Sequence, residues 1–179
     1  MVLTSIRRIA PLLVLTAVLT ACASAPPTAQ DPEAPGFAGG GAWLNSAPLT
    51  LAELRGRVVL VQFWTYGCIN CRNTLPALRR WWKTYRDEGL VIVGVHTPEF
   101  ASERELANVR QAVEREAITW PVVQDNDRAI WKAYSNHYWP HLYLLDHRGR
   151  LIYHHIGEGA YDETEQRIRE ALRAAGETP

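Results

Sequence analysis

The feature that most constrains this chain is the stretch from 58 to 71, where an apolar run leads directly into a Cys-x-x-Cys pair. The run Val58-Val59-Leu60-Val61 carries no polar residue on either face, which is typical of a buried strand. At Cys68 the strand has ended and a helix is expected to begin, so unpaired N–H groups and the helix dipole favour a thiolate there. Cys71, one turn further along, can reach Cys68, and the pair is predicted to switch between dithiol and disulfide. The helix is indicated by apolar residues at helical spacing, namely Leu75, Leu78, Trp82 and Tyr85.

Two other uses of paired cysteines fit the sequence poorly. A structural zinc site needs two more ligands, but the third cysteine is the distant Cys22 and the six histidines show no paired spacing. A purely structural disulfide would gain little stability from closing so short a loop. The pair is therefore interpreted as redox-active, and no metal or cofactor is expected.

Around this pair the chain resembles thioredoxin-fold proteins of the TlpA/DipZ type, which are extracytoplasmic thiol–disulfide oxidoreductases. The resemblance covers the chain from about Trp43 to Leu172. It implies a thioredoxin-like fold and a redox-active Cys68–Cys71 pair. The segments that carry it are 48–56, the cysteine block, Pro76, 95–100 and 138–140.

The pattern of elements in the domain from 42 to 179 predicts an α/β fold with a mixed β-sheet flanked by helices on both faces. Further strands are expected at 90–95 and 120–123, and an antiparallel pair is expected at 142–145 and 151–156. Ser102 and Glu105 form the sequence pattern of a capping box, and Asp127 is expected to cap a further helix. The helix and strand between Ala101 and Val123 resemble the insertion of TlpA-like proteins.

Residues 1–21 have the features of a lipoprotein signal peptide. Arg7 and Arg8 supply positive charge, and the apolar stretch that follows is too short for a permanent membrane span. The sequence Leu19-Thr20-Ala21-Cys22 resembles the bacterial lipobox, which implies cleavage before Cys22 and lipidation of that residue. The alternative is an ordinary secretory signal followed by an incidental cysteine.

Residues 22–41 are rich in alanine, proline and glycine, and they are predicted to form a flexible tether behind the lipidated Cys22. The rest of the composition describes a globular domain, and a monomer is expected. Its formal net charge is zero, so no basic excess indicates nucleic-acid binding. The predicted location is a bacterial membrane, with the domain facing the periplasm or cell exterior, where disulfides persist.

The surroundings of the dithiol leave open which group moves protons. Gln62 stands where minimal thioredoxin carries a buried acid, and Thr74 stands where some TlpA-like proteins have glutamate. Glu99 follows the next buried strand and is expected at the same sheet edge as Cys68. It is therefore a candidate for proton exchange with Cys71. The alternative is that Glu99 is an exposed loop residue without a catalytic role.

Trp139-Pro140 resembles the cis-proline loop of the family, which implies contact with the disulfide and with an extended substrate backbone. A trans proline in an ordinary turn is the alternative. Trp64, Trp139 and Pro140 are the expected substrate-binding residues. Of the tandem tryptophans Trp81 and Trp82, the second fits the apolar stripe of the helix better and is expected in the core.

The leading functional hypothesis is a thiol–disulfide oxidoreductase that reduces disulfides in exported proteins. Ile69-Asn70 offers no charge to stabilise a thiolate further, so a potential below roughly −200 mV is expected. The resemblance implies a membrane electron donor of the DsbD/CcdA type. A thiol peroxidase is the alternative, because Thr65 precedes Cys68 as in the T-x-x-C element of peroxiredoxins, although Val61 replaces the upstream proline. A non-enzymatic binding module beside Trp139 is a third hypothesis.

Overall fold

A computed structural model describes residues 32–176 of the 179-residue chain. The chain divides into two units between Gln30 and Asp31, and the described residues belong to the second. The predicted signal peptide, the predicted lipidation site Cys22 and the part of the predicted tether up to residue 31 lie outside this range. Among the helices within 32–176, none combines the length and apolar character needed to cross a membrane.

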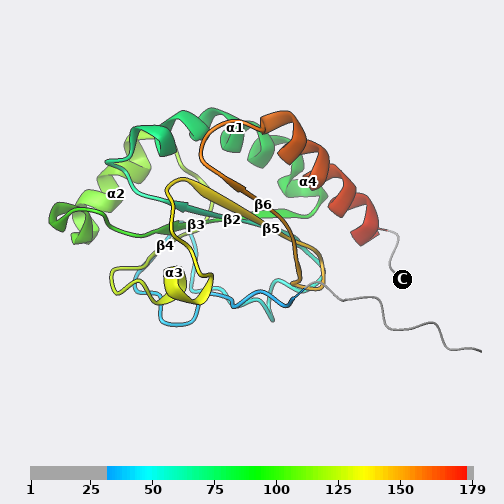
Figure 1. The fold of residues 1–179 in the computed structure, drawn as a ribbon, viewed down its shortest axis with the longest axis horizontal. Coiled ribbons are helices and arrows are strands. Elements are labelled where there is room, and N and C mark those ends of the chain that lie inside the picture. The colour runs from blue at the N-terminus through cyan, green and yellow to red at the C-terminus, as the bar shows by residue number, and fades with distance from the viewer. Residues whose placement is uncertain (1–31, 177–179) are drawn as a thin grey trace, which may run out of the picture. The chain divides into compact units, whose positions relative to one another are not determined.

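A mixed six-stranded sheet, ordered β1-β4-β3-β2-β5-β6, forms the centre of the described domain (Figure 1). Strands β2, β3 and β4 are parallel to one another, whereas β1, β5 and β6 each run antiparallel to their neighbours. All seven residues of β2 are buried, as its unbroken apolar run predicts. The strands are β1 Trp43–Leu44, β2 Val58–Trp64, β3 Leu90–His96, β4 Val122–Gln124, β5 His141–Leu145 and β6 Leu151–Ile156.

Helices cover both faces of the sheet (Figure 1). On one face lie α1 (Ile69–Tyr85), α2 (Leu106–Arg115) and α4 (Tyr161–Gly176), and on the other lies the short α3 (Ala129–Ala133). Each face has its own apolar core, built around Leu60 on the α1 side and around Phe63 on the α3 side. The predicted thioredoxin-like α/β architecture is confirmed, and α2 and β4 form the expected insertion.

The prediction of a flexible tether is wrong for residues 32–41. Glu33 forms a β-bridge with Arg150, and Ala34 and Phe37 are buried in the core on the α3 side. The Phe37 ring also meets the indole of Trp43 edge to face, with centroids 5.7 Å apart. These contacts bury enough apolar surface to order a segment that looks like a linker by composition. The packed domain therefore includes residue 32 onward, rather than beginning at 42.

At two helices the residue that caps the N-terminus is not the predicted one. The side chain of Glu105 makes no cap at the start of α2, so the capping box with Ser102 is wrong; instead, Glu103 accepts backbone N–H groups of the preceding turn. At the start of α3 the residue that caps the helix is Asp125, not the predicted Asp127. Its carboxylate receives N–H groups from the second and third residues of the helix, at 3.0 and 2.9 Å.

The buried face of α1 is rotated slightly from the predicted stripe. Trp81 is 1% exposed and belongs to the core, whereas Trp82 is only partly buried, which reverses the expected order of the two. The Trp81 indole N–H donates to Glu165 of α4 at 3.1 Å, and the Tyr85 hydroxyl donates to the same carboxylate at 2.7 Å. Because an indole N–H needs a partner when buried, this acceptor on α4 allows Trp81 to lie inside.

Candidate active site

The two cysteines occupy different environments at the start of α1. Cys68 is the N-cap residue, with extended backbone angles of φ −79° and ψ 112°, and it is partly exposed. Cys71 is fully buried, and its backbone N–H donates to the Cys68 Sγ at 3.1 Å. Both are free thiols in this structure. The geometry thus presents one sulfur at the surface and keeps the other behind it.

The two thiols also differ in pKa. The hydrogen bond from the Cys71 side chain is the main cause that lowers the pKa of Cys68 to about 7, against the opposing effects of burial and of Glu99. Burial, reinforced by the hydrogen bond to Cys68, raises the pKa of Cys71 far above its ordinary range. At neutral pH Cys68 can therefore ionise while Cys71 keeps its proton. This favours the predicted roles of Cys68 as the attacking thiolate and Cys71 as the resolving thiol.

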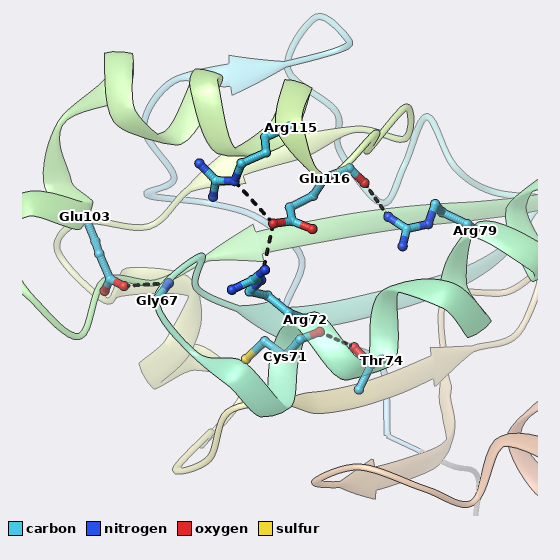
Figure 2. A network of polar contacts seen from close by, with 8 residues as sticks. All are labelled: Gly67, Cys71, Arg72, Thr74, Arg79, Glu103, Arg115 and Glu116. Atoms are coloured by element: carbon cyan, nitrogen blue, oxygen red, sulfur yellow. Dashed lines mark hydrogen bonds and ion pairs between the residues drawn. The ribbon is translucent and has the colours of Figure 1, made fainter.

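Neutral side chains lie behind Cys71 where related proteins carry acids. Gln62 and Thr74 are both buried, and the Gln62 amide donates to the Thr74 hydroxyl at 3.2 Å. The Thr74 hydroxyl in turn donates to the backbone carbonyl of Cys71 at 2.7 Å (Figure 2). These hydrogen bonds link β2 to the first turn of α1, but neither side chain can exchange a proton with the dithiol at neutral pH.

Glu99 lies in the loop after β3, and its side chain is exposed. Its negative charge raises the pKa of Cys68, so the two groups interact electrostatically. A part for Glu99 in proton transfer stays a prediction.

The acid that sequence reasoning missed is Glu103. Its side chain is buried, and its carboxylate accepts the backbone N–H groups of Gly67 at 3.0 Å, Glu99 at 2.6 Å and Phe100 at 3.0 Å. Gly67 immediately precedes Cys68, so this carboxylate connects the loop after β3 to the turn before the dithiol (Figure 2). The available signal was Gly67 itself, because a glycine beside a reactive residue often marks a close approach by another group.

His96 and Thr65 form the buried side of this turn. The His96 Nε2 lies 3.3 Å from the Thr65 hydroxyl, and its ring stacks on that of Tyr66 with centroids 5.6 Å apart. Burial lowers the pKa of His96 to about 4, so the imidazole is neutral at physiological pH. The Thr65 hydroxyl is directed toward this ring and the Glu103 carboxylate, inside the protein.

The bond between Trp139 and Pro140 is cis, as the resemblance implies, while substrate binding by these two residues stays a prediction. The Trp139 indole packs on Trp131 with centroids 4.2 Å apart, and the Arg128 guanidinium lies 5.2 Å above it. Its Nε1–H donates to the carbonyl of Thr97 at 3.1 Å. Trp139 is thereby held against α3 and the loop after β3, which fixes the proline loop relative to the rest of the site.

The expectation that Trp64 binds substrate is wrong, because its side chain is fully buried within the core on the α1 side. Strand β2 directs it inward, under α1. Large apolar side chains that are exposed instead include Ile69, Phe100 and Tyr138, at 61%, 59% and 53%. Ile69 adjoins Cys68 in sequence, and Tyr138 adjoins the cis-proline loop.

A further polar network holds the start of α1 against the end of α2 (Figure 2). The Glu116 carboxylate pairs with Arg72 at 3.2 Å and with Arg115 at 3.4 Å. Its backbone carbonyl accepts a hydrogen bond from Arg79. Arg72, the residue after Cys71, is thus directed toward α2. Within residues 32–176 no group of three or more His, Cys, Asp or Glu side chains is placed to hold a metal ion.

The fold together with this dithiol defines a thioredoxin-fold thiol–disulfide oxidoreductase. Residues 31–154 match the sequence profile of the AhpC/TSA family. The chain belongs to that family.

Individual relatives agree with the resemblance stated from the sequence. Protein DipZ of Mycobacterium tuberculosis is 42% identical over 145 residues, which cover 79% of this chain but 21% of DipZ, so the chain spans about a fifth of that relative's length. The thiol–disulfide oxidoreductase YkuV of Bacillus subtilis is 29% identical over 139 residues, covering 77% of this chain and 93% of YkuV. Among solved structures, the thioredoxin domain of a thiol–disulfide oxidoreductase from Bacteroides vulgatus is similar with a TM-score of 0.64 and 26% identity, over 79% of this chain and 99% of that domain.

Proposed function

We propose that this protein is a lipid-anchored, extracytoplasmic reductant of disulfides in exported proteins. The observation that carries the proposal is the asymmetry of the pair: Cys68 is partly exposed with a pKa lowered to about 7, and the fully buried Cys71 keeps its proton. In such a pair Cys68 can attack a substrate disulfide, and Cys71 can then release the reduced product.

The proposed reaction transfers two electrons from the dithiol to a substrate disulfide. The Cys68 thiolate attacks one substrate sulfur, the substrate S–S bond breaks, and the second substrate sulfur leaves as a thiolate that takes up a proton. Cys71 then loses its proton and attacks the Cys68 sulfur of the mixed disulfide. The first substrate sulfur leaves as a thiol, and the Cys68–Cys71 disulfide remains.

The direction of transfer follows from how weakly the thiolate is stabilised. A pKa of about 7 at Cys68 matches reducing thioredoxins, whereas strong oxidants have first cysteines with pKa values near roughly 3.5. Ile69 and Asn70, between the cysteines, carry no charge that would stabilise the thiolate further. The reduced form is therefore only modestly stabilised, which favours donation of electrons and a potential below roughly −200 mV.

Location and partners rest on the sequence. The signal peptide and the lipobox ending at Cys22 support export and lipid attachment, and an oxidising compartment would supply disulfides as substrates. A membrane thiol transporter of the DsbD/CcdA type is the proposed electron donor, and a monomer is the proposed form.

Redox titration against glutathione, followed by tryptophan fluorescence, tests the reductant assignment. We expect a midpoint below roughly −200 mV, and a midpoint near about −120 mV, as for a dedicated oxidant, would overturn it. Anchoring is tested separately with Cys22→Ser, which should release the domain into the soluble fraction or leave it unprocessed. Trapping of partners on Cys71→Ser would then identify the substrates.

The AhpC/TSA family match supports thiol peroxidase activity as a second candidate. Peroxiredoxin-like chemistry would use the Thr65 hydroxyl beside the Cys68 sulfur, but here that hydroxyl is directed toward His96 and Glu103. The resolving Cys71, three residues away, also favours disulfide exchange. Consumption of hydrogen peroxide with a dithiol donor distinguishes the two activities, since rapid turnover would favour the peroxidase.

A further inference from the structure

The Glu103 carboxylate joins two loops that meet beside the dithiol. One oxygen accepts the N–H of Gly67, in the turn that leads to Cys68, and the other accepts the N–H groups of Glu99 and Phe100. The side chain is 1% exposed, so water cannot replace these donors at the carboxylate. Backbone hydrogen bonds to a buried carboxylate are short and strong, and losing them would leave a buried charge without partners. The carboxylate therefore determines how the Cys68 turn lies against the loop after β3.

Gly67 gives independent evidence that this approach is built into the chain. A Cβ atom on Gly67 would lie 2.4 Å from the Glu103 Oε1, closer than real Cβ atoms come to any neighbour. The glycine is not required by its backbone, because Gly67 is absent from the glycines with positive φ. The close carboxylate thus accounts for glycine at this position.

Glu103 also carries a negative charge into the site. Burial would raise its pKa, but hydrogen bonds from Phe100, Thr65, Glu99 and Gly67 outweigh burial and lower it, so the carboxylate stays ionised. Its charge adds to the effects that raise the pKa of Cys71.

The other charged or titratable groups around the pair do not cancel this charge. Glu99 is also negative and acts on Cys68. His96 is neutral at physiological pH, and Arg72 is paired with Glu116 of the α2 end.

We propose that Glu103 is the positioning residue of this dithiol site, where its carboxylate fixes the turn that presents Cys68 and keeps a permanent negative charge beside that turn. The inference rests on the dithiol–disulfide couple of the proposed function. A fixed negative charge opposes further negative charge on the sulfurs of the reduced form, whereas the disulfide is uncharged. Glu103 therefore favours the disulfide and makes the reduced protein a better electron donor.

Glu103→Gln tests the effect of the charge, because it keeps the size of the side chain. Alkylation of the reduced protein is followed as a function of pH, and the midpoint reports the ionisation of Cys68. We expect the midpoint to fall by about half a pH unit and the equilibrium with glutathione to shift about threefold toward the dithiol. An unchanged or raised midpoint would overturn the proposal.

Glu165→Gln is the matched control. Glu165 is also a partly buried carboxylate that accepts hydrogen bonds from another element, but its donors are Trp81 and Tyr85 of α1 instead of the Cys68 turn. This variant should lose stability and keep the wild-type alkylation midpoint. Equal midpoint shifts in both variants would mean that general loosening is responsible, which would refute a specific part for Glu103.

A double-mutant cycle tests the positioning. Gly67→Ala forces the carboxylate away and should change the alkylation midpoint, whereas the same substitution in a Glu103→Ala background meets no carboxylate and should add little. Equal effects of Gly67→Ala in both backgrounds would contradict the inference. If Glu103→Ala does not fold, the comparison of Glu103→Gln with Glu165→Gln tests the inference by itself.

The wild-type titration separates this inference from the proposed function. A wild-type protein without a reversible dithiol–disulfide midpoint would contradict the function itself. A reversible wild-type midpoint that Glu103→Gln leaves unchanged would contradict only the inference about Glu103.

Discussion

Replacing Cys71 removes the hydrogen bond that does most to stabilise the Cys68 thiolate. The Cys71 side chain is the main cause of the lowered pKa at Cys68, while its backbone N–H contributes less, and a substitution keeps that N–H. Cys71→Ala deletes the side-chain donor. Cys71→Ser replaces the thiol with a hydroxyl that can still donate, and both variants equally lack the resolving sulfur.

The structure sets the size of the expected change. In the wild-type protein half of Cys68 is ionised near pH 7. In Cys71→Ala the pKa should rise toward the ordinary cysteine value of about 8.5, stopping short of it because the helix N-terminus and the backbone N–H groups remain. We expect a midpoint between about 8 and 8.5, so the ionised fraction at pH 7 falls by about 5-fold to 15-fold.

The assay is the pH dependence of alkylation of the reduced protein, with the midpoint as the readout. Rates at a single pH would understate the change, because a thiolate of higher pKa is intrinsically more nucleophilic. Cys71→Ser should lie between Cys71→Ala and the wild type. A midpoint that stays near 7 in Cys71→Ala would refute the argument that the Cys71 thiol stabilises the Cys68 thiolate.

Three further substitutions test other parts of the structure. Glu99→Gln removes a charge that raises the Cys68 pKa, so the alkylation midpoint should fall, and turnover should slow if Glu99 exchanges protons with the dithiol. Gly94→Ala places a Cβ atom 2.9 Å from the Trp64 Nε1 in the core and should lower the free energy of unfolding by about 1–3 kcal/mol in urea titrations. Glu165→Ala leaves two donors on α1 without their acceptor and should cost about 1–3 kcal/mol at pH 7. Because hydrogen bonding lowers the pKa of Glu165, that deficit should shrink as pH falls through its folded-state pKa; a deficit independent of pH would contradict this account.

The architecture was predictable because its strongest signals are local. An apolar run, a Cys-x-x-Cys pair and a helical stripe follow one another without interruption, and they fix β2, Cys68 and α1 in order. The antiparallel pair β5–β6 was likewise indicated by two short runs around a turn. Cys68 and Cys71 needed no tertiary information, since their spacing along one helix brings them together.

What could not be predicted depends on contacts between segments far apart in the sequence. In the sequence nothing distinguishes Glu103 from other loop glutamates, and only the fold brings its carboxylate to 3.0 Å from the backbone nitrogen of Gly67. Trp81 lies in the core because Glu165 of α4 accepts its indole N–H, and the spacing of apolar residues along α1 cannot reveal that contact. From the sequence, Trp64 is expected to bind substrate beside Cys68, yet it is the last residue of β2, which is buried on both faces. Local patterns determine which element a residue occupies, whereas burial and partners depend on the packed neighbours.

The packing of residues 32–41 would shorten the tether between a lipid on Cys22 and the folded domain. Pro32 accepts a hydrogen bond from the backbone of Leu151, so the chain is held to the sheet from that point onward. A lipid on Cys22 would therefore reach the domain through at most roughly 35 Å of extended chain, about half the span that a tether ending at residue 41 would give. Since the volume that a tethered domain can sweep grows steeply with tether length, the shorter tether would keep the dithiol of such a lipidated form closer to the membrane surface. An electron donor embedded in that membrane would then meet Cys68 more often than a free-floating domain would allow.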